Sequence, residues 1–415
     1  MSFVTGLKCV MCGAEYPARS VMTCPRCGIT GILDVQYDYR AVARRLTRRA
    51  LASRDDPTQW RYRELLPIGA GARLPALAVG GSPLRPAPAL ARHLGLASLL
   101  LKDDGRNPSA SLKDRASAVG AVKAVEARRK TIACASTGNA ASSLAGMAAS
   151  LGLKAMIFVP ERAPEPKLAQ LLIFGATVLR VRGSYDQAWD LCQQACDRWG
   201  WYNRNCAVNP YLVEGKKTVS LEICEQLAWK VPDWVAVSVG DGCTIAGVWK
   251  GFAEMRRLGL TRRVPKLLGV QAEGAAPVAA AFRSGGALVP VEPRTMADSI
   301  AVGVPRNWKK AVDAVRASGG AMVTVSDEEI REAMRATGRL TGVFAEPAAA
   351  AAVAGLARAA RERTIPRRTA ALAVITGNGL KDSRSALEAA PRPVDVPPDL
   401  EAVARALDGV GRGAP

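Results

Sequence analysis

Histidine is nearly absent from this chain of 415 residues, which contains a single copy, His93. A Ser-His-Asp or Cys-His catalytic site would need that one imidazole, and most catalytic zinc sites need more than one. Sites of these kinds are therefore not expected. Any chemistry in this chain has to use lysine, a carboxylate or a bound cofactor.

Long apolar stretches are also missing. No uninterrupted apolar run reaches the roughly 18 residues of a membrane-spanning helix. The N-terminus, MSFVTGLKCV, lacks the charged start, apolar stretch and small-residue cleavage site of a signal peptide. We expect a soluble cytoplasmic protein without a membrane partner. Because the chain is 49% hydrophobic and longer than a usual domain, we expect two or three domains.

Negative charge is in the minority, and the net charge is +20. The excess of Lys and Arg is spread along the chain rather than gathered in one tail, and its densest cluster, RRLTRRA (44–50), is typical of a helix face. Aromatic residues make up only 5% of the chain and do not alternate with basic ones. We therefore expect small anionic substrates rather than nucleic acid as partners.

Cysteine is present 10 times, and four copies form two C-x-x-C pairs. These are Cys9, Cys12, Cys24 and Cys27. Gly13 and Gly28 directly follow the pairs, so residues 1–35 are typical of a structural zinc ribbon with four thiolate ligands. Two disulfides are the alternative, which a reducing compartment disfavours. The other cysteines, such as Cys134 and Cys224, lie in apolar segments and are predicted to be buried.

Short apolar runs alternate with helical patterns from about residue 99 onward, which predicts an α/β protein with parallel strands covered on both faces. The strand candidates are residues 98–103, 131–136, 154–160, 177–182, 234–240, 266–272 and 371–376. Helix-length segments between them include 139–151, 184–199 and 327–340. The Pro-rich segment 390–400 is predicted to link to a short C-terminal helix.

Three loops rich in glycine and in small polar residues follow predicted strands. They are STGN (136–139), GDGCT (240–244) and TGNG (376–379). Ligands of open α/β sheets bind beyond the carboxyl ends of the strands, and a helix N-terminus favours an anion. The loop 240–244 is therefore a candidate phosphate cradle, although glycine at such turns often serves geometry alone.

A lysine occurs at the joint between a turn and a helix in NPSASLKDRAS (107–117). In the simplest interpretation, a serine caps the helix and the charges of Lys113, Asp114 and Arg115 are solvated in its first turn. A phosphate cradle, an Asn/Ser/Thr loop and a lysine together are what a pyridoxal phosphate (PLP) enzyme needs. We therefore favour Lys113 as a cofactor lysine, with Asp114 and Arg115 as supporting charges.

Several motifs occur in an order that resembles the threonine synthase branch of the fold-type-II PLP enzymes, relatives of tryptophan synthase β subunit and of serine/threonine dehydratases. They are LKCVMCGAEYP, CPRCG, LDVQYDY, GGSPL, NPSASLKDR, ASTGNA, NPYLVEGKKT, SVGDG, ADSIAVGVPRN, EPAAAAA and TGNGLKD. The resemblance covers roughly residues 1–390 and implies two three-layer, parallel-sheet domains behind the zinc-ribbon-like segment. The implied domains are a large PLP-binding domain (36–132 and 215–390), a small α/β domain (133–214), and a linker with a short helix (391–415).

The resemblance also implies a role for each matching residue. Lys113 would form the Schiff base, Asn139 would bind the ring 3-oxygen, and Thr376 would face the pyridine nitrogen. The phosphate cradle would consist of Gly240, Asp241, Gly242, Cys243 and Thr244. Ser136 and Thr137 would hold the substrate carboxylate, and Lys167 would contact the substrate phosphate.

A hydroxyl beside the pyridine nitrogen leaves the ring a milder electron sink than a carboxylate would, which suits elimination and replacement. The implied reaction converts O-phosphohomoserine to threonine and phosphate by γ-elimination and β-hydration, with Lys113 carrying the protons. The implied enzyme is a carbon-oxygen lyase of amino-acid biosynthesis. Members of the family are often dimers, so a homodimer is expected.

The chain departs from the phosphohomoserine pattern at Ala140, Cys206 and Leu212, where members of the family often carry groups that hold the substrate phosphate. Loss of one such contact costs about 1.5–3 kcal/mol. Two alternatives therefore remain. One is β-replacement or β-elimination on serine, threonine or O-phosphoserine-like substrates, as in cysteate synthase. The other is a non-catalytic homologue, which is disfavoured because Lys113, Asn139 and Thr376 are present.

Overall fold

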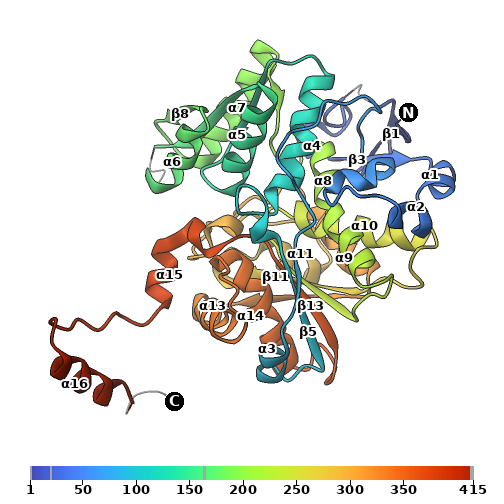
Figure 1. The fold of residues 1–415 in the computed structure, drawn as a ribbon. Coiled ribbons are helices and arrows are strands. Elements are labelled where there is room, and N and C mark those ends of the chain that lie inside the picture. The colour runs from blue at the N-terminus through green and yellow to red at the C-terminus, as the bar shows by residue number, and fades with distance from the viewer. Residues whose placement is uncertain (1, 19–20, 162–164, 412–415) are drawn as a thin grey trace.

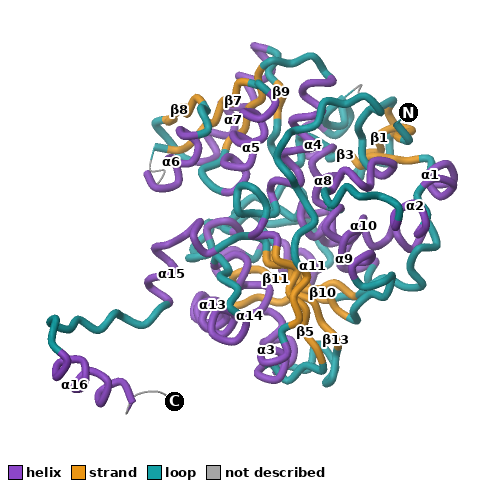
Figure 2. The backbone as a smooth tube through the Cα atoms, in the orientation of Figure 1, coloured by secondary structure: helices purple, strands orange, loops and turns teal. Residues whose placement is uncertain are grey.

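The chain forms three β-sheets flanked by helices in the computed structural model, which describes residues 2–18, 21–161 and 165–411. Figure 1 shows the N-terminal sheet at one side of the body, with the two larger sheets above and below the middle. Figure 2 separates the strands, in orange, from the helices that surround them. The α/β class and the parallel sheets predicted from the sequence are confirmed.

The N-terminal sheet is antiparallel, with the order β2-β1-β3. Its strands are β1 (Val4–Cys9), β2 (Glu15–Tyr16) and β3 (Leu33–Tyr37). The inner face, with Leu7 and Val35 fully buried, packs against α4 (Lys113–Glu126) through Val119 and Val122. Two short helices follow, α1 (Tyr39–Arg45) and α2 (Arg48–Ala52). The N-terminal segment is therefore attached to the helix that begins with Lys113.

The largest sheet has six strands in the order β12-β11-β10-β13-β5-β4, parallel except at the β4 edge. They are β12 (Ala321–Val325), β11 (Lys266–Ala272), β10 (Trp234–Ser238), β13 (Ala370–Ile375), β5 (Ser98–Asp103) and β4 (Leu84–Pro86). Almost every position of β10, β11 and β13 is buried, because helices cover both faces. This explains the nearly continuous apolar runs that predicted these strands.

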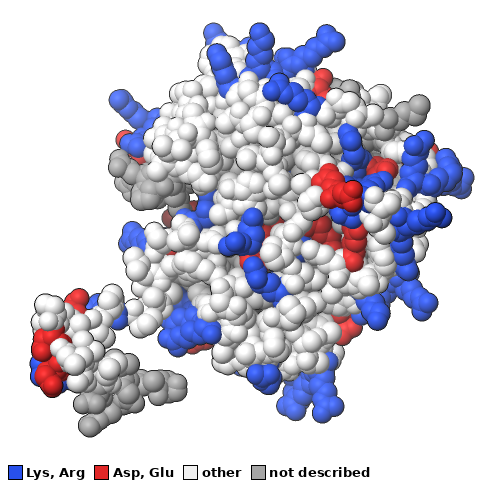
Figure 3. Space-filling model, viewed as in Figure 1, with Lys and Arg blue, Asp and Glu red and all other residues white. Residues whose placement is uncertain are grey.

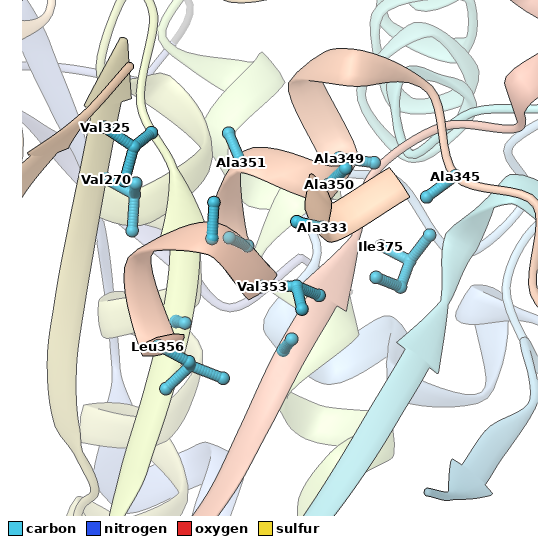
Figure 4. Packing of buried hydrophobic residues seen from close by; sticks show 14 of the residues in the cluster. Val270, Val325, Ala333, Ala345, Ala349, Ala350, Ala351, Val353, Leu356 and Ile375 are labelled. Carbon is cyan, nitrogen blue, oxygen red and sulfur yellow. The ribbon is translucent and has the colours of Figure 1, made fainter. Parts of the chain in front are cut away.

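Alternate strand residues contact different helix layers. One face, with Ala236 and Val270, packs against α3 (Pro88–His93), α13 (Asp327–Thr341) and α14 (Pro347–Arg361). Figure 4 shows α14 lying across the strands, and a side chain at Gly355 would collide with Val270. The other face, with Val235 and Val237, packs against α9 (Thr218–Gln226), α10 (Cys243–Arg257), α11 (Pro277–Ser284) and α12 (Trp308–Ala317).

The third sheet has four parallel strands in the order β8-β7-β6-β9. They are β8 (Thr177–Val181), β7 (Lys154–Pro160), β6 (Thr131–Ala135) and β9 (Tyr202–Asn203). One face packs against α5 (Asn139–Leu151) and the described part of α6 (Glu165–Ile173), and the other against α7 (Tyr185–Trp199). Because β6 begins two residues before the predicted boundary at residue 133, that boundary crosses a strand. The domain boundaries stay a prediction.

The charges that follow Lys113 are buried. The Asp114 carboxylate accepts hydrogen bonds from the backbone N–H and the hydroxyl of Ser109, both at 2.7 Å. Arg115 pairs with Asp104 and Glu222, each at 2.6 Å, and all three side chains are nearly inaccessible to solvent. A solvated first turn is therefore wrong. These residues fix the start of α4 from inside the protein.

The C-terminal segment leaves the body after α15 (Ser383–Ala389) and ends in α16 (Leu400–Gly411), which Figure 1 shows apart from the sheets. Within the described ranges, none of the helices combines the length and the apolar character needed to cross a lipid bilayer. Figure 3 shows Lys and Arg dispersed over several elements of one face, in line with their spread along the sequence.

Candidate functional site

A cavity lies between the two larger sheets and collects most of the residues that the sequence singled out. These are Lys113, Ser136, Gly240, Asp241, Gly242, Cys243, Thr244 and Thr376. A second cavity shares Lys113 and Ser136 with the first and adds Thr137 and Asn139. Three loops and one helix start, which are spread between residues 113 and 379, thus meet.

Lys113 is the first residue of α4 and lies beside the loop that follows β13. The Leu112 N–H donates to the Thr376 carbonyl at 2.8 Å, and the Asn378 N–H donates to the Ala110 carbonyl at 3.0 Å. These bonds fix the Lys113 backbone next to Thr376. Burial lowers the pKa of the Lys113 amine, and the charges of Lys216 and Arg204 add to this effect. More of the amine is therefore neutral than in a solvated lysine.

The loop after β10 forms an open helix N-terminus. Gly242 caps α10 with a φ of 95°, a left-handed conformation that favours glycine. Among the hydrogen bonds of the described residues, none uses the backbone N–H groups of Gly242, Cys243 or Thr244. The Asp241 carboxylate accepts from the Arg306 N–H at 2.7 Å, which joins this loop to the segment before α12. Unpaired N–H groups at the start of a 15-residue helix suit an anion.

Asn139, the first residue of α5, is engaged with a carboxylate that the sequence analysis left without a role. Its amide nitrogen donates to the two carboxylate oxygens of Glu346 at 2.9 and 3.0 Å. Glu346 is 3% exposed, and burial raises its pKa against the opposing effects of Asn139 and Lys113. Glu346 is the first residue of the quoted motif EPAAAAA, so the motif could have marked it as a candidate site residue. Its contact with Asn139 is visible only in the structure.

Two buried cations that the sequence analysis missed border the first cavity. Arg204 and Lys216 are each 1% exposed. Arg204 donates to the hydroxyl of Ser117 at 3.1 and 3.2 Å, and neither cation forms an ion pair with a carboxylate within the part of the chain that the structure describes. Both lie near the Cys206 sulfur, at 3.9 Å from Arg204 and 3.6 Å from Lys216. Because two buried positive charges share this one thiol, a further anion in the cavity would stabilise both residues. Lys216 lies within the quoted motif NPYLVEGKKT and could have been noticed there.

The three departures from the family pattern have different surroundings. Ala140 and Cys206 line the cavity. Leu212 lies in α8 (Tyr211–Lys216), is 1% exposed and faces Gly120 of α4, so its side chain belongs to the helix packing. Lys167 belongs to α6, but its side chain falls outside the described residues, and its predicted contact stays a prediction.

The four N-terminal cysteines lie together at the end of β1. All their sulfur atoms are within 4.8 Å of one another, with Cys9 to Cys27 at 4.0 Å and Cys12 to Cys24 at 3.6 Å. A tetrahedral zinc with bonds of about 2.3 Å places its sulfur ligands about 3.8 Å apart. The four thiols therefore fit a zinc ion. Cys9 and Cys24 share a buried cluster with Val119 of α4, and none of the four cysteines lines the cavity that contains Lys113.

Comparison with known proteins agrees with this geometry. Residues 76–377 match the family described as pyridoxal-phosphate dependent enzyme. The chain is 38% identical to threonine synthase of Methanocaldococcus jannaschii, over 96% of this chain and 98% of that protein. It is 40% identical to threonine synthase of Methanosarcina acetivorans, over 97% of this chain and 98% of the other.

Solved structures share the fold. The processed form of threonine deaminase isoform 2 from Solanum lycopersicum matches with a TM-score of 0.64 and 24% identity, over 74% of this chain and 86% of that one. Maize serine racemase matches with a TM-score of 0.63 and 19% identity, over 80% and 92% of the two chains. Fold, site and matches thus define a PLP-dependent enzyme of fold type II. The chain belongs to the threonine synthase family, whose members are lyases of amino-acid biosynthesis.

Proposed function

We propose that this enzyme converts O-phosphohomoserine to threonine and phosphate. The observation that carries the proposal is one cavity that combines the Lys113 amine, the open N-terminus of α10 and the buried cations Arg204 and Lys216, which have no carboxylate partner among the described residues. A phosphorylated substrate in a PLP enzyme brings two phosphate groups, one on the cofactor and one on the substrate. The cavity offers separate groups for both.

The residues present fit PLP. The free N–H groups of Gly242, Cys243 and Thr244 would bind its phosphate, and Lys113 would bind its aldehyde carbon. Thr376 would face the pyridine nitrogen, and Asn139 would donate to the ring 3-oxygen, where Glu346 now accepts. When bound, PLP draws electron density away from the substrate Cα.

The protein groups then divide the work of binding and proton transfer. Ser136 and Thr137, in the loop before α5, would hold the substrate carboxylate. Arg204 and Lys216 would bind the leaving phosphate in place of the family contacts that this chain lacks at Ala140 and Leu212. The Lys113 amine, with its lowered pKa, would accept the Cα proton and then carry the Cβ proton.

Three further features belong to the proposal. Cys9, Cys12, Cys24 and Cys27 would hold a structural zinc, because four thiolates leave no open position for catalysis. The enzyme would work in the cytoplasm, where a reducing environment keeps these thiols available for zinc. A homodimer and the domain division at residues 133 and 215 follow the family resemblance.

An assay of phosphate release and threonine formation tests the reaction. With PLP and O-phosphohomoserine, we expect both products in equal amounts, and Lys113→Ala should lower the rate by about 10²–10⁴-fold or more, as loss of a catalytic base does. Lys154→Ala, at the exposed start of β7, is the matched control and should leave the rate unchanged. Turnover of O-phosphoserine or serine without any threonine from O-phosphohomoserine would instead assign β-elimination chemistry, for which Ala140 and Cys206 already leave room.

A further inference from the structure

Two cysteines from distant parts of the chain meet in the cofactor cavity. Cys206 lies in the turn between β9 and α8, and Cys243 is the first residue of α10. Their sulfur atoms and a carboxylate oxygen of Asp241 all lie within 4.8 Å of one another. Both residues line the same cavity as Lys113. To form a disulfide, the two sulfur atoms would have to approach to the bond length of about 2.05 Å.

The surroundings of Cys206 favour a thiolate. A hydrogen bond from Cys243 and the charges of Lys216, Arg204 and Lys113 hold the pKa of the Cys206 thiol well below its usual range, although burial opposes them. The Lys216 amine lies 3.6 Å and an Arg204 guanidinium nitrogen 3.9 Å from the sulfur. Cys206 is partly exposed to the cavity. A thiolate with these neighbours and with access to small molecules is the reactive kind of cysteine.

Cys243 is suited to be the second thiol. Its pKa is raised well above the usual range by the hydrogen bond to Cys206 and by burial, so the shared proton stays on this sulfur. The sulfur also donates to the Asp241 carboxylate at 3.3 Å. A carboxylate that accepts this proton would free Cys243 to attack an oxidised Cys206.

We propose that Cys206 and Cys243 form a redox-active dithiol that controls access to the phosphate cradle. The formation of this disulfide does not depend on the proposed PLP site, but its expected effect on PLP binding does. The Cys206 thiolate attacks one oxygen of hydrogen peroxide, which breaks the O–O bond and yields a sulfenic acid and hydroxide. Cys243 then attacks the sulfenic sulfur, its proton leaves with the hydroxyl group as water, and the disulfide forms. In total the two sulfurs lose two electrons, and one peroxide becomes one water and one hydroxide, which takes up a proton from solvent to give the second water.

The disulfide would act on the cradle because of where Cys243 lies. Its backbone N–H is one of the three free donors at the start of α10, and its side chain would be drawn toward Cys206 across the cavity. An anion could then no longer meet all three N–H groups. Conversely, a phosphate bound at these N–H groups would hold the first turn of α10 in place and hinder the approach of Cys243 to Cys206.

A second pair of neighbouring cysteines in the same chain provides a comparison. Cys192 and Cys196 are also neighbours, one turn apart on α7, but both are buried. The hydrogen bond to Cys196 and burial raise the pKa of Cys192 far above its usual range. Cys192 therefore stays a thiol, and because both cysteines are buried we expect this pair to resist the same oxidant.

The experiment treats PLP-free enzyme with hydrogen peroxide and measures its mass, its disulfides by peptide mapping and its affinity for PLP by absorbance titration. We expect loss of two hydrogen atoms, a Cys206–Cys243 peptide and PLP binding weaker by about tenfold or more, as for loss of a charge-assisted contact. Dithiothreitol should restore the binding, and prior loading with PLP should prevent the disulfide.

Two variants and one control make the result specific. Cys206→Ser and Cys243→Ser should each abolish the disulfide and make the PLP affinity of that variant, whatever its value without peroxide, insensitive to peroxide, whereas Cys224→Ser, at a buried cysteine of α9, should behave like the original chain. A disulfide between other cysteines, or a Cys206–Cys243 bond without loss of PLP binding, would overturn the proposal. If reduced enzyme binds no PLP at all, the proposed function fails, while the peptide map still decides the dithiol.

Discussion

The Lys113 side chain shows how position controls reactivity at the scale of one residue. Burial lowers the pKa of its amine, and Lys216 and Arg204 lower it further, while Cys206 and Glu346 act in the opposite direction. The amine must be neutral to attack an aldehyde, so a lowered pKa extends this reaction toward neutral pH. The two buried cations would therefore have two effects: they lower the pKa of Lys113, and they would stabilise a bound anion.

Replacing a neighbour of Lys113 should move the pH dependence of PLP capture. With Lys216→Gln, one charge that opposes protonation of Lys113 is gone, so its pKa rises and the midpoint of the capture rate shifts to higher pH. With Cys206→Ser, a thiolate that favours the protonated amine is gone, so the midpoint shifts to lower pH. Stopped-flow absorbance of PLP-free enzyme mixed with PLP over a pH series measures both midpoints.

The pH midpoint should rise in Lys216→Gln and fall in Cys206→Ser, and a general effect of mutation would not produce both shifts. The exposed Lys154→Ala variant should keep the original midpoint. Equal midpoints in all three variants would mean that burial alone sets the pKa of Lys113, and the electrostatic explanation would be wrong.

At the scale of elements, the N-terminal sheet matters through its contact with α4. Leu7, Cys9 and Val35 share one buried cluster with Val119 and Val122, two turns after Lys113. The sheet is short, since β2 has only two residues, and a sheet of this size needs additional cross-links to be stable. A zinc ion bound by the four cysteines would supply them.

Removal of zinc should destabilise the protein without changing the groups in the cavity. We expect one zinc per chain by elemental analysis, and Cys24→Ser should lose it, because Cys24 is fully buried in the cluster. The melting temperature should fall, and PLP should still bind at saturating concentration. Cys134→Ser, a buried cysteine of β6, should keep the zinc. A zinc content that does not depend on Cys24 would contradict the proposed ligand set.

Most of the central elements could be predicted from the sequence. Residues 98–103, 154–160 and 266–272 were expected as strands and form β5, β7 and β11 with the same bounds. Their apolar runs are bounded by polar or glycine residues, and both faces are covered, so local pattern and tertiary environment agree. The strands β4, β9 and β12 were not expected, because two or three residues, or an edge strand with partly exposed positions, leave no clear pattern.

The candidate site was predictable where glycine and polar residues follow strands, and less so where long-range contacts decide. Residues 240–244 and Lys113 carried their own local signals. The pairing of Glu346 with Asn139, the burial of Arg204 and the approach of Cys206 to Cys243 depend on how separate segments pack. Spacing along the chain contains no information about those distances.

At the scale of the whole molecule, a charge network centred on the partly buried Asp34 joins the N-terminal sheet to α8, α10 and α12. Asp34 of β3 pairs with Lys250 of α10 at 3.1 Å and with Lys310 of α12 at 2.9 Å. Lys250 also pairs with Glu214 of α8 at 2.8 Å. Although burial acts to raise it, these lysine charges hold the pKa of Asp34 far below its usual range.

Asp34→Asn should destabilise the protein at neutral pH and progressively less in strong acid. A carboxyl group with a depressed pKa stabilises the folded state fully above its unfolded pKa of about 4, and this stabilisation is lost as the pH falls from there toward the folded pKa. The variant should therefore lose about 2 kcal/mol of unfolding free energy at neutral pH, and the difference should begin to shrink only below about pH 4. Urea unfolding over a pH series measures this difference.

Asp313→Asn on α12 is the matched control. Asp313 pairs with Lys309 at 2.5 Å, but its side chain is 43% exposed. Exposed pairs of this kind contribute about 0.5 kcal/mol or less. If Asp313→Asn lowers the unfolding free energy as much as Asp34→Asn does, the Asp34 network stabilises the protein no more than an exposed ion pair.

The position of β13 has a consequence for how the enzyme is made. This strand lies between β10 and β5 in the centre of the largest sheet, yet it is the last strand of the chain. On a ribosome that adds about 5–20 residues per second, β5 would wait roughly 15–50 s for this neighbour. During that time β5 and β10 would expose unpaired edges, which invite aggregation. Truncated products of translation would thus lack the centre of the sheet and the loop beside Lys113, and they would be candidates for chaperone binding or proteolysis.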